Sequence, residues 1–318
     1  MTQTLLAAAE LWRPNASANV FDLQSGFYGG CEALRSVPSQ VTPALDEGPL
    51  GQVAATGRPL VLSELSEMGF LMGEAAATEG LSAAALLPSY RHGVVDSILV
   101  MYLRSGPEAV AAVELWAGTK GRFELSLDQS YYAGLERFSR ISQYVNFPQG
   151  SGLPGQCWQT GMPLIVPDLA TAKGFLRSSG AESDGLAVGL GLPIMQRTEL
   201  RSVFLMLSSA ATPIARVHEI WVEDPEQPGG LTRSQGTYGG QINFNAASQD
   251  LTFSIGQPDG LPAQAWTSGQ PVLIDGVEAM GEAGMKRLDA AREAGLSFAL
   301  AWPVVVVDRV RAVVLMMG

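Results

Sequence analysis

The sequence of 318 residues is poor in charged side chains, in cysteine and in histidine. Charged residues make up 16% of the chain, against about 25% in an ordinary soluble domain, which predicts unusually extensive burial of surface. Two cysteines, Cys31 and Cys157, provide no disulfide framework and fit a reducing compartment. The two histidines, His92 and His218, have no second His or Cys at ligand spacing. We therefore expect no metal site, no Ser-His-Asp triad and no cofactor.

Long apolar runs and basic segments are also missing. No apolar run reaches the ~18 to 20 residues of a membrane-spanning helix, and the start MTQTLLAAAELW has no basic region typical of a signal peptide. We therefore expect a cytoplasmic protein. The formal net charge of -11, with three lysines in the whole chain, argues against nucleic acid and anionic membrane surfaces as partners, because both reward basic patches.

What the sequence does contain is an internal repeat. The stretch GSGLPGQCWQTGMPLIVPDL at 150–169 has counterparts in GPLGQVAATGRPLVLSEL at 48–65 and GLPAQAWTSGQPVLIDGV at 260–277. A Glu-Leu-Trp or Glu-Ile-Trp tripeptide starts at positions 10, 114 and 219, which gives spacings of 104 and 105 residues. The chain therefore divides into unit 1 (1–105), unit 2 (106–210) and unit 3 (211–318), each long enough for its own core.

Unit 2 indicates the order of elements in one repeat. We expect strands at 112–116 and 123–127 around a turn at 117–121, and a third extended segment at 138–145. Pro154 suits the start of a helix over 154–160 and Gly161 its end, with an edge strand at 163–168. A second helix over 175–184 then precedes strands at 187–192 and 202–207, joined by a hairpin through 198–200. Strands with segregated short helices predict an α+β fold.

The late strand has two different faces. Ala187, Gly189 and Gly191 lie on one face, and Val188, Leu190 and Leu192 lie on the other. A face of small residues lets a helix or a ligand approach the sheet closely. Close packing of a helix is the favoured interpretation.

This order and these residues resemble the GAF domain, a small-molecule sensory module of phosphodiesterases, phytochromes and bacterial histidine kinases. The resemblance rests on GSGLPGQCWQTGMPLIVPDL, FLRSSGAESDGL, AVGLGLPI and SVFLMLSS in unit 2, and it is closest to the subtype found in multidomain sensor kinases. It implies three tandem GAF-like domains, each an antiparallel sheet with short helices on one face. Units 1 and 3 match less well; in unit 1, for example, Ala54 stands where unit 2 has Trp158.

The sequence departs from that family in the segments between the units. The resemblance implies helices before the first and after the last strand of each domain, which dimerise and carry signals. Only about 104–109 separates unit 1 from unit 2, which leaves no room for a long coupling helix. One face of each sheet should then lack its cover, and burying a few hundred Å² at ~25 cal/mol per Å² gives roughly 5 to 10 kcal/mol. We expect these faces to pack against each other, against another subunit in a homo-oligomer, or against a protein partner.

Candidate ligand-binding residues are those that differ among the units. In unit 2, Trp158, Asp168, Phe175 and Arg177 could border a pocket between the sheet and the second helix, where the resemblance places GAF ligands. Aromatic walls with one carboxylate and one guanidinium suit a small polar organic ligand. The alternative is that these residues are core and solvated charges. The tryptophans of the repeated tripeptide are expected to anchor the cores, because all three units keep them: Trp12, Trp116 and Trp221.

The two thiols favour packing over chemistry. The counterparts of Cys157 in the other units are Val53 and Ala265, which indicates an apolar position. The GAF relative that reduces free methionine sulfoxide needs several cysteines in one domain, and each unit here has at most one. The sequence therefore predicts a non-catalytic regulatory protein that binds a small ligand or partner proteins and signals through assembly. A structural scaffold without ligand is the alternative, and a cysteine-based redox sensor or reductase is a more distant one.

Overall fold

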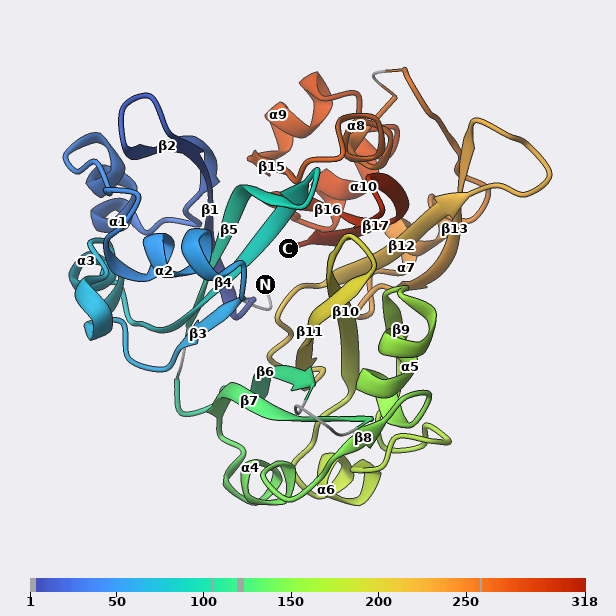
Figure 1. The fold of residues 1–318 in the computed structure, drawn as a ribbon. Helices are drawn as coiled ribbons and strands as arrows, with labels where there is room; N and C mark the ends of the chain where they lie inside the picture. The colour runs from blue at the N-terminus through green and yellow to red at the C-terminus, as the bar shows by residue number, and fades with distance from the viewer. Residues whose placement is uncertain (1–3, 105, 119–122, 258) are drawn as a thin grey trace.

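The fold consists of three units of similar architecture arranged around a common centre (Figure 1). The computed structural model describes residues 4–104, 106–118, 123–257 and 259–318. Unit 1 contains β1 Leu6–Asn15, β2 Val20–Phe27, α1 Glu32–Ser36, η1 Val37–Ser39, α2 Gly48–Thr56, β3 Leu60–Leu62, η2 Glu67–Gly69, α3 Gly73–Thr78, β4 Leu81–Arg91 and β5 Val94–Arg104.

Units 2 and 3 repeat this order with small changes. Unit 2 contains β6 Ala111–Gly118, β7 Glu124–Ala133, α4 Glu136–Ser142, β8 Phe147–Pro148, α5 Gly152–Thr160, β9 Leu164–Val166, α6 Ser178–Ser183, β10 Val188–Gln196 and β11 Glu199–Ser208. Unit 3 contains β12 Val217–Glu223, β13 Gly230–Thr237, α7 Ile242–Ala246, β14 Phe253–Ser254, α8 Leu261–Ser268, β15 Val272–Asp275, α9 Val277–Glu282, α10 Leu288–Glu293, β16 Phe298–Val306 and β17 Arg309–Met317.

Each unit forms its own antiparallel sheet. The strand orders are β2-β1-β5-β4-β3, β8-β7-β6-β11-β10-β9 and β14-β13-β12-β17-β16-β15. The first strand therefore pairs with the last strand of its own unit, as Glu114 in β6 does with Leu205 in β11. Each sheet lies within one of the three ranges predicted from the repeat. The α+β class is confirmed, since short helices accompany an antiparallel sheet in each of three tandem units.

A recurrent glycine explains where the helix of the repeated stretch ends in each unit. Helix α5 ends at Thr160 because Gly161 adopts a left-handed conformation with φ of 64°. The backbone N–H of Gly161 then donates to the carbonyl oxygen of Cys157 at 2.9 Å. Gly57 and Gly269 end α2 and α8 in the same way, with φ of 61° and 64°. Strand β9 follows at the sheet edge, as predicted.

Two expectations about unit 2 need correction. The segment 138–145, expected to be extended, lies mostly in helix α4, whose Phe138 and Ser142 are both buried. Residues four apart share one face of a helix, and this buried face packs near α6. The second helix begins at Ser178 rather than at 175, so Phe175 and Arg177 precede it. Part of the expected turn at 117–121 lies outside the described residues.

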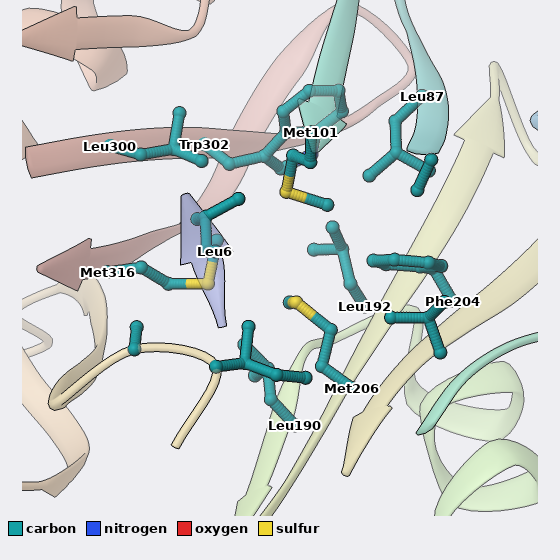
Figure 2. Packing of buried hydrophobic residues seen from close by; sticks show 14 of the residues in the cluster. Leu6, Leu87, Met101, Leu190, Leu192, Phe204, Met206, Leu300, Trp302 and Met316 are labelled. Carbon is teal, nitrogen blue, oxygen red and sulfur yellow. The ribbon is translucent and has the colours of Figure 1, made fainter. Parts of the chain in front are cut away.

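A single apolar core lies between the three sheets (Figure 2). Strand β10 contributes Leu190 and Leu192 from its large-residue face, and β16 contributes Leu300 and Trp302. Side chains from β1 and β5 of unit 1 meet them in Figure 2, including Leu6 and Met101. The opposite sheet faces carry the helices and form a separate core in each unit. The faces left without helices thus pack against each other within one chain.

The units contact one another in a closed ring. Strand β3 lies near β7, β9 near β12 and β13, and β15 near β2. At the first two junctions a glutamine side chain caps the edge strand: Gln129 Oε1 accepts from Val61 N at 2.8 Å and Gln235 Oε1 from Ile165 N at 2.7 Å. At the third junction Phe27 stacks on Phe298, with ring centroids 4.1 Å apart. The third contact thus differs in chemistry from the first two, but all three close the same ring.

The linkers between the units are short, as expected. Strand β5 ends at Arg104 and β6 begins at Ala111, and the described part of this linker contains no helix. Because the sheet faces are already buried, a second subunit or a protein partner would have to use another surface. Among the described residues, none of the helices is both long and apolar enough to cross a bilayer.

Candidate functional site

The centre of unit 2 holds a buried carboxylate surrounded by donors. Glu114, in β6, is fully buried. Its Oε2 accepts from Trp116 Nε1 at 2.8 Å, and its Oε1 accepts from the Tyr132 hydroxyl at 2.7 Å. Arg177 Nη1 donates to Oε1 at 2.6 Å and Nη2 to Oε2 at 2.8 Å, which makes a two-pronged ion pair. The repeated Glu-x-Trp sequence thus positions one acceptor and one donor on the same face of the first strand.

The Arg177 guanidinium is enclosed by aromatic rings. Its carbon lies 4.5 Å from the ring centroid of Phe138 and 5.2 Å from that of Trp116. The rings of Phe147 and Phe175 lie 5.6 Å away. Ser142 Oγ accepts a further bond from Nη1 at 2.6 Å. The chain's own guanidinium therefore fills the space that aromatic walls could offer to a cationic or polar ligand.

Burial and the arginine act in opposite directions on the pKa of Glu114. Desolvation raises that pKa, but the charge and hydrogen bonds of Arg177 outweigh it and the pKa is lowered. Unit 3 has the same arrangement, in which Arg287 Nη1 and Nη2 donate to Glu219 at 2.5 and 2.8 Å. The pKa of Glu219 is lowered for the same balance of causes. Both carboxylates are thus ionised structural partners.

Unit 1 departs from this pattern. Met72 occupies the position eight residues before Gly80 at which the other units have an arginine before Gly185 and Gly295. Glu10 instead accepts three hydrogen bonds from neutral donors, from Trp12 Nε1 at 2.9 Å, the Tyr28 hydroxyl at 3.2 Å and the Tyr102 hydroxyl at 2.7 Å. Desolvation raises the pKa of Glu10, and these bonds lower it only in part. Unit 1 thus contains a buried carboxyl group with no cation paired to it in the described structure.

The difference between the carboxyl groups predicts opposite pH dependences. Because the pKa of Glu10 is raised on folding, its favourable contribution is present below the usual glutamate pKa and is lost as pH rises. We expect the stability of Glu10→Gln relative to the parent to increase from acidic pH to neutrality. Glu114→Gln should show the opposite trend, since the lowered pKa of Glu114 gives a contribution that is lost as pH falls. Urea unfolding at a series of pH values measures both, and parallel trends would contradict the assignment.

The structure brings together only part of the predicted ligand set. Phe175 and Arg177 are both buried and lie within cation–π distance of each other. Trp158, in α5, is half-buried against the helix-side core of unit 2. Asp168 is exposed, and its Oδ2 accepts from the Thr171 hydroxyl at 2.6 Å in a local turn. Ligand binding by these four residues stays a prediction, and Arg177 would first have to leave Glu114.

The small-residue face of β10 is occupied by helix α5. A Cβ atom at Gly191 would lie 2.6 Å from Cys157 Sγ, and one at Gly189 would lie 2.9 Å from a methyl group of Leu169. The interpretation of this face as a site of close helix packing is confirmed. Burial raises the pKa of Cys157 to about 12, and it also raises the pKa of Cys31. Both thiols are buried and lie in different units.

The two histidines lie in different environments, one buried and one exposed. His218 lies inside β12 and is buried, and desolvation lowers its pKa to about 4. His92 lies at the tip of the β4–β5 hairpin, where its Nδ1 is 3.4 Å from Asp308 Oδ2. In the part of the chain that the structure describes, no cluster of His, Cys, Asp and Glu could hold a metal ion.

The sequence expectations do not include the buried carboxylates and their arginines. In the sequence Glu114 marks the repeat, and Arg177 differs from its counterpart in unit 3 only if the helix-ending glycines are left unaligned. An alignment on Gly185 and Gly295 places Arg177 opposite Arg287. A glutamate retained in an apolar first strand, together with an arginine at a fixed distance from a helix-ending glycine, would have predicted the pair.

The cavities found inside units 1 and 3 are small. One of about 60 Å³ lies beside Pro43, Leu50 and Met72 in unit 1. Another of about 10 Å³ lies beside Phe253 and Arg287 in unit 3. Sites for small organic molecules usually measure about 300 to 1,000 Å³. Neither cavity could hold such a ligand without rearrangement.

Comparisons with solved structures find GAF domains and a free methionine-R-sulfoxide reductase. The nlh2 GAF domain of A. aeolicus in an inactive state is 20% identical, with a TM-score of 0.26, over 31% of this chain and 58% of that chain. A GAF domain of a phosphoenolpyruvate-protein phosphotransferase from Coxiella burnetii is 23% identical, with a TM-score of 0.26, over 31% and 56%. The free methionine-R-sulfoxide reductase from Neisseria meningitidis, solved with its substrate, is 16% identical, with a TM-score of 0.25, over 32% and 53%.

These likenesses concern the fold alone. Each covers about a third of this chain, and little more than half of the other protein's length. No protein-family model matches the sequence, and a search of the curated proteins finds no match.

Proposed function

We propose that this chain is a non-catalytic regulatory protein of three GAF-like units, which works by binding a small ligand, a protein partner or both. The observation that carries the proposal is the threefold recurrence of this fold with its reactive side chains in structural roles. Glu114 and Glu219 are paired with arginines in the unit cores. Cys31 and Cys157 are buried with raised pKa values, which disfavours thiolate chemistry.

Binding would couple the units through their shared core. Large side chains from all three sheets pack together there, so a displacement of one sheet changes the packing of the other two. Signalling would then reach another protein through the outer surface, because the sheet faces are internal. A homo-oligomer formed through that outer surface is part of this proposal.

Native mass spectrometry of the purified full chain tests the proposal, because it reports retained small molecules and subunit number together. We expect a retained ligand, a defined oligomer or a complex with a partner. A ligand-free monomer that gains no mass in the presence of cell metabolites or proteins would contradict it.

A structural scaffold without ligand is the second candidate, and the filled interiors favour it. Arg177 and Arg287 occupy the centres of units 2 and 3, and the cavities seen in units 1 and 3 are small. A scaffold would give a defined oligomer with no retained small molecule in the same measurement.

Thiol labelling under native conditions separates both candidates from a cysteine enzyme or redox sensor. We expect both thiols to react with a disulfide reagent far more slowly than in the urea-unfolded chain, because they are buried and their pKa values are raised. Cys31→Ala and Cys157→Ala identify which thiol any reaction belongs to. Rapid labelling of either thiol in the folded protein would favour the redox alternative.

A further inference from the structure

A cleft of about 430 Å³ lies where unit 3 meets unit 1. Thr4 and Arg104 line it from unit 1, and Arg216, Ser297 and Gly318 line it from unit 3. Gly318 is the last residue of the sequence, and Figure 1 marks this end near the centre of the molecule. The volume falls within the range of about 300 to 1,000 Å³ usual for small-molecule sites, unlike the cavities inside units 1 and 3.

Arg216 supplies a buried guanidinium to the cleft. Its exposed fraction is only 7%, and burial lowers its pKa. Nη1 donates to the carbonyl oxygen of Ala294 at 2.7 Å and Nη2 donates to that of Gly295, which orients the group. Nε is buried and has no hydrogen-bond partner. Since a guanidinium has five N–H donors, these two bonds leave capacity for an acceptor in the cleft.

Arg104 supplies a second guanidinium at the end of β5. Its Nη2 lies 3.5 Å from Cys31 Sγ, which is a weak acceptor, and its Nε is buried without a partner. The ion pairs found within the described ranges involve neither Arg104 nor Arg216. Arg177 and Arg287, by contrast, each bind a buried carboxylate. The cleft therefore concentrates positive charge in a chain whose net charge is -11.

The two arginines belong to this junction and not to the repeat. Counted from the first-strand glutamates, Arg216 corresponds to Ala7 and Ala111. Arg104 lies four residues after the strand partner of Glu10, where unit 2 has Ser209. A unit can thus fold without either charge. The hydrogen bonds to the carbonyl oxygens of Ala294 and Gly295, just after α10, give a structural role to Arg216 only.

Paired guanidinium groups recognise carboxylate and phosphate oxygens by charge and by their planar donor geometry. An anion between them would satisfy the free donors and offset the mutual repulsion of the two cations. We propose that the cleft binds a small molecule through an oxyanion, a carboxylate or a phosphate, held by Arg104 and Arg216. This inference rests on the proposed binding function and places its ligand between units rather than inside one.

Isothermal titration calorimetry of the full chain tests the site with two probes, inorganic phosphate and succinate, which separate the two oxyanion sources. We expect at least one probe to bind at millimolar concentration or below. Arg104→Gln should weaken that binding about tenfold or more, because it removes one of the two positive charges. Since Arg104 is partly exposed, the variant should still fold. Arg292→Gln is the matched control, since it removes one exposed guanidinium from unit 3 outside the cleft and should leave binding unchanged.

A second variant covers the case in which loss of Arg216 prevents folding. Arg216→Lys keeps the positive charge but loses the planar pair of guanidinium donors, so we expect it to weaken binding severalfold. Its circular dichroism spectrum should match that of the parent. Absence of binding by both probes would overturn the inference, as would equal affinity of Arg104→Gln and the parent, or equal losses in Arg104→Gln and Arg292→Gln. A small molecule retained by Arg104→Gln in native mass spectrometry would place the ligand elsewhere and leave the proposed function standing.

Discussion

Replacement of Arg177 by methionine should destabilise the protein by about 3 to 5 kcal/mol, because it leaves the buried Glu114 carboxylate without its cation. Both partners of this ion pair have side chains with 0% exposure. The loss of stability should be smallest at acidic pH, because Glu114 then takes up a proton and no longer requires a charge partner. Urea unfolding followed by circular dichroism at neutral and acidic pH measures the effect.

Two controls separate the buried charge from the loss of packing. Arg177→Met combined with Glu114→Gln removes both charges and should recover a large part of the lost stability. Arg292→Met removes an exposed arginine, which pairs with Glu278 at 2.8 Å on the surface, and should change stability by less than about 0.5 kcal/mol. A cost for Arg177→Met as small as that of Arg292→Met would show that the pair contributes nothing.

Truncation of Trp302 to alanine is expected to cost about 3 to 5 kcal/mol and to weaken all three units together. Trp302 is 4% exposed, and Figure 2 shows its ring among side chains from all three units. Because the core is shared, the unfolding transition should shift to lower denaturant concentration as a single step. Tryptophan fluorescence and far-ultraviolet circular dichroism, followed in the same urea series, should give coincident curves.

The matched control for Trp302 is an aromatic side chain outside the core. Phe123 is 89% exposed, so Phe123→Ala should leave the midpoint almost unchanged. Separate transitions in Trp302→Ala, with unit 3 unfolding before the others, would show that the units are stabilised independently.

Local sequence determined those parts of the fold that depend on backbone geometry. Helix α5 could be placed because a proline near its start and Gly161 at its end act within one turn. The two faces of β10 could be assigned because alternation is a property of any strand. Constant spacing then extended the description of one unit to the other two.

The errors arose where contacts distant in sequence decide the outcome. Phe138 belongs to a helix because α4 buries one face near α6, although aromatic residues by themselves favour strands. The partnership of Glu114 and Arg177 spans 63 residues, and no local pattern contains it. Arg104 and Arg216 come from different units, so their common cleft follows only from how units 1 and 3 meet.

The closed ring also limits how the chain can associate with copies of itself. Each unit presents an edge strand to the next unit, which is a head-to-tail contact, and such contacts produce either closed rings or open filaments. Here the third contact, with Phe27 stacked on Phe298, joins unit 3 back to unit 1. The last two free contact surfaces are therefore paired within the same chain. If that junction opened, both surfaces would become available to neighbouring chains, and the same geometry that now terminates growth would propagate a polymer.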